Sequence, residues 1–225
     1  MSLKNKVILI TGASKGLGKS LVELLSTCDT RIIALARSIN STNLPKEVTK
    51  IPCNVRDLLS IDLAFKTIDK DFKKIDILIN CVGRALVKPL EDTSREEIMD
   101  VFGINLKGNI YIAQEVYKRM LPHKSGQILN VVSTSGIRAR ENETIYAASK
   151  WGLKGFTDSL RAEAKPNGIK VLGVYPGGMR TDFWSILPDK DISKYMDPAL
   201  IAKHIVNMLD TEGSISPTDL VIDRF

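Results

Sequence analysis

Seven short apolar runs, each containing β-branched residues, constrain the fold of this chain more than any other feature. Most are continuous and do not alternate with polar residues, as is typical of strands covered on both faces. Segments with helical periodicity lie between most of them, so the chain predicts an α/β fold with a doubly wound parallel sheet of about seven strands. The expected strands lie at 7–11, 31–36, 48–52, 75–80, 126–133, 169–176 and 219–223, and the expected helices at 17–28, 58–72, 94–120, 145–165 and 197–210.

Composition and charge narrow the class of protein. Hydrophobic residues make up 44% and charged residues 26% of the 225 residues, and no apolar run reaches the length of about 18 residues that a membrane span needs. The basic residues behind the net charge of +6 are scattered, which favours a solvated surface or a polyanionic small ligand over nucleic acid. The N-terminus has no signal-peptide cleavage site, and the three cysteines form no C-x-x-C pair. We therefore expect one cytoplasmic domain over residues 1–225, with free thiols and no metal site, that binds neither membranes nor nucleic acid.

The stretch TGASKGLG, residues 11–18, directly follows the first expected strand. Gly12, Gly16 and Gly18 allow a tight turn and a close approach of backbone N–H groups to a phosphate, and the helix expected from about Leu17 directs its positive end there. The G-x-x-x-G-x-G spacing differs from the usual G-x-G-x-x-G fingerprint. An ordinary glycine-rich turn is the alternative, but the position between strand and helix favours phosphate binding.

The stretch IYAASKWGLKGF, residues 145–156, places Tyr146 and Lys150 four residues apart. In a helix their Cβ atoms would be about 5–6 Å apart. An ammonium group so close to a phenol favours the phenolate and lowers the pKa of the tyrosine. The pair is therefore a candidate for acid–base catalysis, although two surface residues often show the same spacing.

Six segments together resemble the classical short-chain dehydrogenase/reductase family over nearly the whole chain. Each segment lies on the expected element, and their order is that of the family. In chain order they are TGASKGLG (the cofactor loop), NCVG at 80–83 (N-N-A-G), VFGINLKGN with Asn105, NVVSTSG at 130–136 with Ser133, Tyr146 with Lys150 (Y-x-x-x-K), and PGGMRT at 176–181 (P-G-x-x-x-T).

The resemblance implies a Rossmann-type fold and an oxidoreductase that interconverts a small ketone, aldehyde or 3-keto compound and its alcohol by hydride transfer. Tyr146 is implied to be the acid/base. Work near neutral pH requires lowering its pKa by about two to three units. The implied catalytic residues are Asn105 (which would position a water and kink its helix), Ser133 (which would donate a hydrogen bond to the substrate oxygen), Tyr146 and Lys150. The implied cofactor-binding residues are Gly12, Ser14, Lys15, Gly16, Leu17, Gly18, Arg37, Asn54, Val55, Asn80, Gly83, Tyr146, Lys150, Pro176, Gly177, Met179 and Thr181.

Three positions depart from the family pattern. Cys81 and Val82 replace an asparagine and an alanine, while Asn80 and Gly83 preserve the turn beside the adenine ribose. Asn54 stands where the family often has an aspartate, and its carbonyl oxygen remains able to accept a hydrogen bond from the adenine amino group.

The end of the second expected strand predicts the cofactor. A carboxylate that binds the ribose diol is expected there when NAD is preferred. The strand ends instead in Ala36, followed by Arg37, and Lys15 lies in the glycine loop. Guanidinium groups pair well with phosphate, and in the family a basic residue at either position accompanies NADP(H). We therefore expect NADP(H).

The substrate is less constrained. Arg138 and Arg140 lie between Ser133 and Tyr146, and each is a candidate for binding a substrate carboxylate or phosphate, with a solvated rim position as the alternative. Phe183 and Trp184 are candidates for an apolar lid within an irregular loop at 181–197.

Two of the expected helices carry bulky apolar residues on more than one face, and in the family these helices pair across a two-fold axis. A second apolar stripe needs a second partner, so at least a homodimer is expected. A homotetramer is the alternative. Many members of the family build subunit contacts with a longer C-terminal tail, whereas this chain ends almost with its last strand. The apolar residues concerned are Ile104, Ile110, Val116, Trp151, Phe156 and Leu160.

Two other functions stay open. One is a catalytically weak NADP(H)-binding redox sensor or scaffold, which would be expected to lack the tyrosine or the lysine. The other is a nucleotide-sugar epimerase or dehydratase of the related extended fold, which the lack of a substantial C-terminal domain disfavours.

Overall fold

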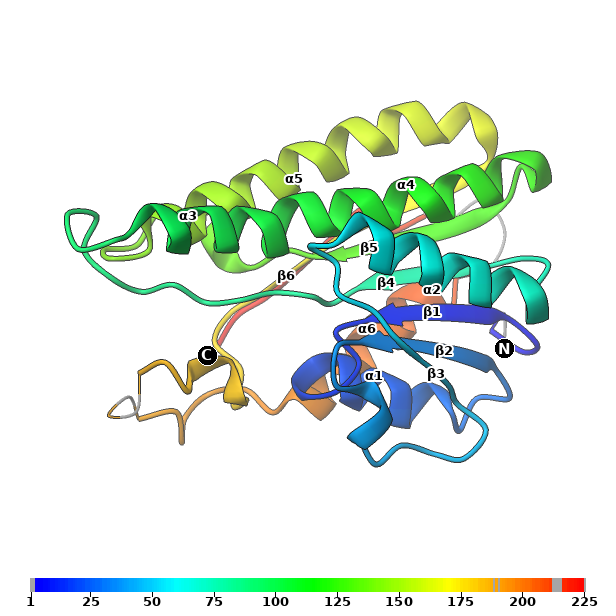
Figure 1. Cartoon of the computed structure of the whole chain (residues 1–225), viewed down its shortest axis with the longest axis horizontal. Coiled ribbons are helices and arrows are strands. Elements are labelled where there is room, and N and C mark those ends of the chain that lie inside the picture. Colours follow the sequence, from blue (N-terminus) through cyan, green and yellow to red (C-terminus); the bar gives the residue numbers. More distant parts are fainter. Residues whose placement is uncertain (1–2, 188, 190, 212–215, 225) are drawn as a thin grey trace.

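The structure, a computed structural model, describes residues 3–187, 189, 191–211 and 216–224. Its centre is a parallel sheet of seven strands in the order β3-β2-β1-β4-β5-β6-β7 (Figure 1), which confirms the expected fold class. The strand order reverses between β1 and β4, the place where such sheets bind ligands. The strands are β1 (Val7–Thr11), β2 (Arg31–Ala36), β3 (Thr49–Pro52), β4 (Ile77–Asn80), β5 (Gly126–Val131), β6 (Ile169–Pro176) and β7 (Asp219–Ile222).

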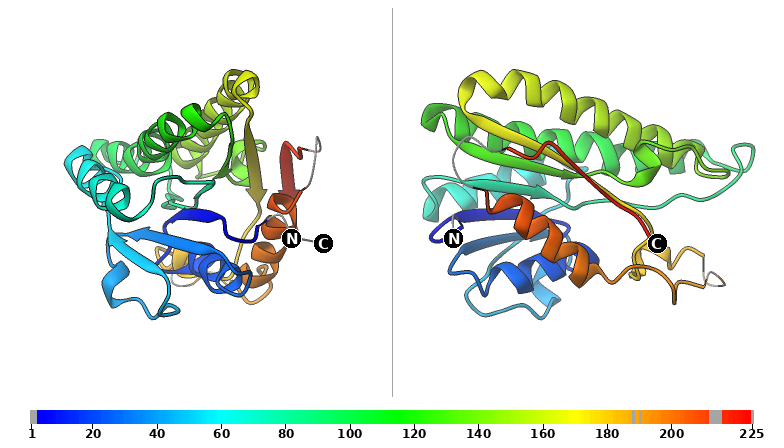
Figure 2. Two further views of the ribbon diagram at one scale, coloured as in Figure 1. Left: turned by 90° about the vertical axis from the view of Figure 1, so that its right-hand side faces the viewer. Right: turned by 180° about the vertical axis from the view of Figure 1, so that it is seen from behind.

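Helices cover both faces of the sheet and give the molecule three layers (Figure 2). One face carries α1 and α6, and the other carries α2, α3, α4 and α5. The helices are α1 (Gly16–Leu25), α2 (Leu58–Asp71), α3 (Arg95–Phe102), α4 (Asn109–Met120), α5 (Thr144–Ala164) and α6 (Pro198–Leu209).

The inner strand β1 explains why the apolar runs are continuous. Every residue of β1 is buried. Ile8 and Ile10 pack into the core beneath α1 and α6, whereas Val7 and Leu9 pack into the core beneath α2, α4 and α5. Successive side chains point to opposite faces of a strand, so a strand with helices on both sides needs apolar residues at every position.

The expected helix at 94–120 is divided into three parts. Between α3 and α4 lies a π-helical segment, Gly103–Gly108. Such segments are single-turn bulges that recur at functional sites. This one contains Asn105 and brings Gly108 close to Val55, where an added Cβ would lie 2.7 Å from Val55 Cγ2.

The start of α3 differs from expectation by one residue. The sequence TSRE at 93–96 predicts a capping box with Thr93 as the cap, which is wrong, because Ser94 and Glu97 form the box instead. Ser94 Oγ accepts a hydrogen bond from Glu97 N at 3.1 Å, and Glu97 Oε2 accepts one from Ser94 N at 2.8 Å. The Thr93 hydroxyl instead donates to the carbonyl oxygen of Pro89 at 2.9 Å.

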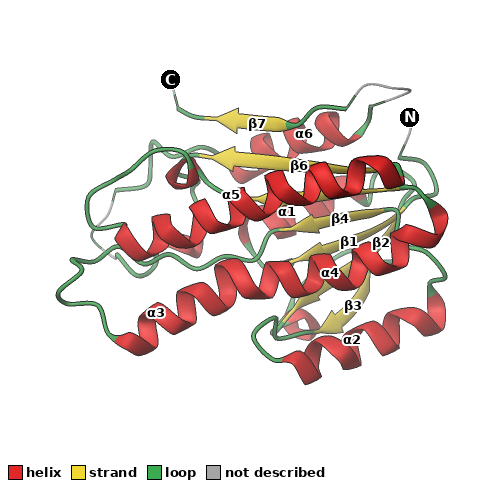
Figure 3. Ribbon diagram, turned by 90° about the horizontal axis from the view of Figure 1, so that it is seen from above, coloured by secondary structure: helices red, strands yellow, loops and turns green. Residues whose placement is uncertain are grey.

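The strands point toward one end of the molecule, where the loops after β1, β4, β5 and β6 gather (Figure 3). No described helix combines the length and apolar character required to cross a membrane.

Candidate active site

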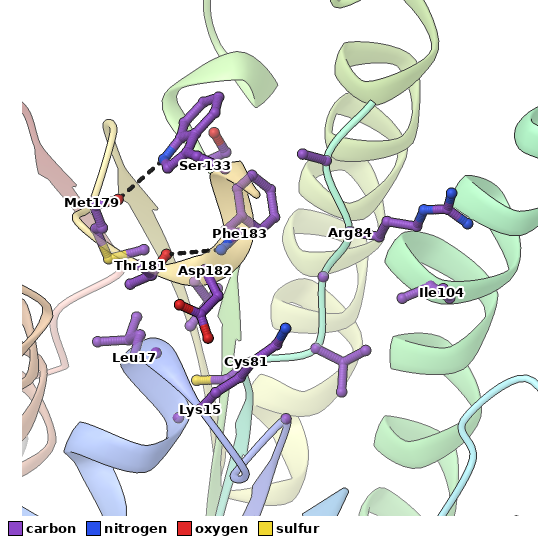
Figure 4. A pocket seen from close by; sticks show the side chains of 18 of the residues that line it. Lys15, Leu17, Cys81, Arg84, Ile104, Ser133, Met179, Thr181, Asp182 and Phe183 are labelled. Carbon is purple, nitrogen blue, oxygen red and sulfur yellow. Dashed lines mark hydrogen bonds between the residues drawn. The ribbon is translucent and has the colours of Figure 1, made fainter. Parts of the chain in front are cut away.

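A cavity of about 740 Å³ opens at the carboxyl ends of the strands, around the point where the strand order reverses. The implied catalytic and cofactor-binding residues all line it except Asn80 and Asn105. Figure 4 shows Lys15 and Leu17 at one side of the cavity, Ser133 and Phe183 at another, and Arg84 and Ile104 at a third. The structure thus brings together residues that are far apart in the sequence.

The glycine loop has the geometry that phosphate binding requires. Gly12 and Gly16 have φ values of +66° and +55°, a region that favours glycine. A Cβ atom at Gly18 would overlap the carbonyl oxygen of Gly12. No side chain caps the N-terminus of α1, so the first backbone N–H groups of this helix remain available for an anion. The loop therefore fits a dinucleotide pyrophosphate.

We predict that Gly18→Ala raises the dissociation constant for NADPH at least about tenfold, because the new methyl group must push Gly12 away from the phosphate position. Gly155→Ala is the matched control, since a Cβ at this glycine of α5 meets no atom within 4 Å. Circular dichroism should show both variants folded, and NADPH fluorescence titration should separate them. Equal affinities in the two variants would contradict this role of the loop.

The end of β2 carries positive charge and no carboxylate. Ala36 ends the strand, and Arg37 and Ser38 follow it along the wall of the cavity. Neither Arg37 nor Lys15 forms a side-chain hydrogen bond or ion pair with any residue that the structure describes, and both are exposed. Two cations are thus available where the 2′-phosphate of NADP(H) would lie.

Asn54 is held by its own turn. Its side-chain oxygen accepts a hydrogen bond from the backbone N–H of Arg56 at 3.2 Å, and its backbone N–H donates to Ser60 Oγ at 2.9 Å. A carbonyl oxygen has two acceptor positions, so one of them remains for the adenine amino group.

Asn80 lies behind the cavity. Its Nδ2 donates to the carbonyl oxygen of Asn109 at 3.2 Å and to Asn130 Oδ1 at 3.0 Å, and its Oδ1 accepts from Thr11 Oγ1 at 3.3 Å. The side chain therefore ties together β1, β4, β5 and α4. Asn80 therefore affects the cavity indirectly, by holding the backbone of the residues that follow it and line the cavity.

Cys81, which stands where the family has an asparagine, preserves the backbone turn after β4. The backbone N–H of Cys81 donates to Thr11 Oγ1 at 3.1 Å. Burial raises the pKa of the Cys81 thiol to about 12, against the nearby ammonium of Lys150. The thiol is therefore protonated at neutral pH and is not a nucleophile.

Ser133 lines the cavity with its hydroxyl directed at Tyr146. Its Oγ accepts a hydrogen bond from the backbone N–H of Ser135 at 3.1 Å, and its side chain forms a hydrogen bond with the Tyr146 phenol. Because Oγ already accepts from Ser135, its hydroxyl proton is available to donate to the phenol or to a substrate oxygen, as an oxyanion-type stabiliser requires.

Lys150 is buried beneath the catalytic end of the cavity, with 3% of its surface exposed. Its Nζ donates to the carbonyl oxygen of Val131 at 3.1 Å and lies 6.0 Å from the centre of the Tyr146 ring. Burial lowers the pKa of Lys150 to about 8. The lysine therefore loses its charge closer to neutrality than an exposed lysine does.

The pKa of Tyr146 shifts in the direction opposite to the one expected. Burial raises it above the ordinary value, with the hydrogen bond from Ser133 acting against burial, the Glu143 carboxylate reinforcing it and the Arg140 guanidinium opposing it. The expected lowering of this pKa is therefore wrong for the protein alone, because burial outweighs the hydrogen bond from Ser133 and the charge of Arg140.

Asn105 holds the backbone that faces Lys150. Its Oδ1 accepts from the N–H of Arg84 at 2.7 Å, and its Nδ2 donates to the carbonyl oxygen of Arg84 at 3.0 Å. A Cβ atom at Gly83 would lie 3.6 Å from Lys150 Nζ and 3.9 Å from Asn105 Oδ1. The two predicted catalytic residues thus meet beside Gly83.

Sequence reasoning missed a charged cluster on the cavity wall. Asp100 Oδ1 lies 2.7 Å from Arg56 Nη2, and Asp100 Oδ2 lies 2.8 Å from Arg84 Nη1. The one signal for it was that Arg84 directly follows the N-C-V-G motif.

The loop after β6, expected at 181–197, lines the cavity with residues 181–186. Residues 188 and 190 of this loop lie outside the described residues. Phe183 and Trp184 both line the cavity. The rings of Tyr146 and Phe183 meet edge to face, with centroids 5.8 Å apart. Trp184 anchors the loop, since its Nε1 donates to the carbonyl oxygen of Met179 at 3.0 Å.

Comparison with known proteins agrees with this geometry. Residues 6–191 match the short chain dehydrogenase family, and the chain belongs to it. It is 31% identical to Carbonyl reductase family member 4 of Xenopus laevis over 92% of each chain. It is also 31% identical to 3-oxoacyl-[acyl-carrier-protein] reductase FabG of Vibrio harveyi, over 95% of this chain and 93% of the relative. The fold matches that of a variant of actinorhodin polyketide ketoreductase with NADPH, with a TM-score of 0.85, 24% identity and coverage of 97% of this chain and 96% of the other.

Proposed function

We propose that the protein is an NADP(H)-dependent oxidoreductase that interconverts a small ketone, aldehyde or 3-keto compound and its alcohol, with Tyr146 as acid/base. One observation carries the proposal. Ser133, Tyr146 and Lys150 line the same cavity as a glycine loop shaped for phosphate. The reductase names of two relatives and the NADPH in the structurally similar ketoreductase support the reaction class and the cofactor.

The chain has residues suited to each part of the cofactor. The glycine loop and the N-terminus of α1 would hold the pyrophosphate, Lys15 and Arg37 the 2′-phosphate, Asn54 and Val55 the adenine, and Lys150 the nicotinamide ribose. The loop from Pro176 to Thr181 would cover the nicotinamide. When bound, NADPH supplies the hydride, and its oxidised form adds positive charge beside the tyrosine.

The proton comes from the protein. As the carbonyl oxygen gains negative charge, the Ser133 hydroxyl donates a hydrogen bond to it and the Tyr146 phenol protonates it. Lys150 in its charged form favours the tyrosinate that remains. The raised pKa of Tyr146 keeps the phenol protonated at neutral pH, which is the form that carbonyl reduction uses.

This assignment predicts how reduction depends on pH. Reduction requires a protonated Tyr146 and a charged Lys150, and the pKa of Lys150 lies at about 8. We expect kcat/KM for carbonyl reduction to be level below about pH 8 and to fall above it as the lysine loses its proton. Arginine keeps its charge throughout this range. In Lys150→Arg the fall in kcat/KM should therefore move to higher pH, even if the maximal rate of this variant is lower. A fall at the same pH in both proteins would contradict the role of Lys150.

A panel of carbonyl compounds tests the proposal as a whole. Initial rates of NADPH oxidation should rise above the background with at least one ketone, aldehyde or 3-keto ester. Tight NADPH binding without turnover across the panel would favour the redox sensor or scaffold instead.

We also infer that the protein is a homodimer at least, although fewer apolar residues are available for the contact than the sequence suggested. Val116 and Leu160 belong to the core, and Ile104 lines the cavity, so they leave no apolar stripe for a partner. Met99 on α3 and Trp151 on α5 remain 73% and 50% exposed. Large exposed apolar side chains support a contact between copies of the chain.

We expect light scattering to give the mass of a dimer or tetramer, and Trp151→Glu to raise its dissociation constant by about 30-fold, as for an interfacial tryptophan. Leu59→Glu is the control, because Leu59 is 65% exposed on α2, away from α5. A monomer at all concentrations would contradict the inference.

A further inference from the structure

The reacting side of the cavity contains a guanidinium that has no part in the cofactor site or in proton transfer. Arg140 lines the cavity together with Ser133 and Tyr146. Its Nη2 donates to Thr134 Oγ1 at 3.0 Å, and Thr134 is fully buried and directly follows Ser133. The charge of Arg140 also reaches the phenol, where it lowers the pKa of Tyr146 against the larger effect of burial. Arg140 therefore lies beside the carbonyl-reducing groups.

Within the described part of the chain, no carboxylate neutralises Arg140. Glu143 is close in sequence, but it is 5% exposed, and its Oε2 accepts a hydrogen bond from Ser135 Oγ at 2.6 Å. Asp182 also lines the cavity, and Figure 4 shows its carboxylate directed toward Leu17 and Cys81 rather than toward Ser133. The positive charge of Arg140 is thus available to a ligand.

Arg138, two residues earlier, has a different environment. Its Nη1 lies 2.7 Å from Asp223 Oδ2, and its side chain is 60% exposed. It is not among the residues that line the cavity. The two arginines of this loop therefore allow a matched comparison. Arg138 forms an ion pair outside the cavity, whereas Arg140 lines the cavity and forms no ion pair with a described residue.

Arginine suits an oxyanion that presents two oxygens side by side. Its guanidinium has five N–H donors in a fixed fork, and Thr134 accepts from only one of them. The remaining donors can form a bidentate contact with a carboxylate or a phosphate. The hydrogen bond to the buried Thr134 orients the fork before a ligand arrives, although the residue as a whole is exposed at the cavity rim.

We propose that Arg140 determines substrate specificity by binding an anionic group of the carbonyl substrate, so that the preferred substrates are keto acids and hydroxy acids. The inference rests on the proposed function. The carboxylate binds Arg140 while the carbonyl a few bonds away faces Ser133 and Tyr146. A phosphate ester offers the same oxyanion chemistry, and the experiment separates the two.

The test compares matched pairs of substrates with NADPH. Acetoacetate and methyl acetoacetate differ in the carboxylate charge, and dihydroxyacetone phosphate and dihydroxyacetone differ in the phosphate. We expect kcat/KM to favour the anionic member of one pair. In Arg140→Gln the ratio of anionic to neutral kcat/KM should fall about 10- to 100-fold, as for the loss of a charged hydrogen bond. The ratio cancels any effect of Arg140 on Tyr146, which acts on both substrates. Arg138→Gln should leave the ratio unchanged, and Arg140→Lys should restore part of it.

Binding measurements distinguish this proposal from the proposed function. Calorimetry with the protein–NADP⁺ complex should show that 3-hydroxybutyrate or glycerol 3-phosphate binds, and that Arg140→Gln weakens binding about tenfold or more. Such binding without turnover of any carbonyl would overturn the proposed function and leave the anion site standing. Reduction of neutral carbonyls with no preference for either anion, or a ratio unchanged in Arg140→Gln, would overturn the anion site alone. Neither binding nor turnover would overturn both.

Discussion

Replacing Tyr146 by phenylalanine is expected to lower turnover by at least about 10²-fold, the effect of losing a positioned proton donor. The side chain is 6% exposed and contacts Phe183 edge to face, and phenylalanine keeps that packing. The glycine loop and the end of β2 are untouched, so NADPH should bind as before. Turnover is measured at saturating NADPH, and binding by fluorescence titration.

Tyr111→Phe serves as the control, because Tyr111 lies on α4 and does not line the cavity. It should retain normal turnover. Near-normal turnover in Tyr146→Phe would rule out the tyrosine as the acid.

Placing an acid at the end of β2, with Ala36→Asp and Arg37→Ala together, should reverse the cofactor preference. In the unaltered protein Lys15 and Arg37 each offer the 2′-phosphate a charged contact of about 1 kcal/mol or more, so kcat/KM should favour NADPH over NADH on the order of 10²-fold. Aspartate at position 36 would instead bind the ribose diol of NADH and repel the 2′-phosphate.

The control for this pair is Arg31→Ala at the opposite end of the same strand, where the guanidinium stacks on Phe72 with 4.5 Å to the ring centroid. It should leave the preference unchanged. A preference for NADH in the unaltered protein would refute the interpretation of Lys15 and Arg37.

The fold was predictable because its main determinant is local. Strands covered on both faces need continuous apolar runs, and all seven runs became strands of one sheet. Details that depend on tertiary contacts were not predictable. The sequence contains two overlapping capping patterns, T-S-R-E and S-R-E-E, and in the structure it is the second that forms the capping box. The π-helical segment contacts Val55 and Arg84, which lie in the loops after β3 and β4.

The site was predictable to the extent that short motifs specify it. The glycine loop, Ser133, Tyr146 and Lys150 all reach one cavity. The direction of the Tyr146 pKa shift was not predictable, because it depends mainly on how deeply the folded chain buries the phenol. The sequence also left Arg138 and Arg140 equivalent, since the partner of Arg138 lies 85 residues away.

The central claim is that one cavity binds NADP(H) and a carbonyl compound and that Tyr146 protonates the carbonyl oxygen. A crystal structure with NADP⁺ and the best alcohol from the panel tests it most directly. We predict that the alcohol oxygen lies within about 2.6–3.2 Å of both the Tyr146 and Ser133 hydroxyl oxygens, with the 2′-phosphate between Lys15 and Arg37. An alcohol oxygen bound away from Tyr146, or a cofactor bound outside the glycine loop, would contradict the account.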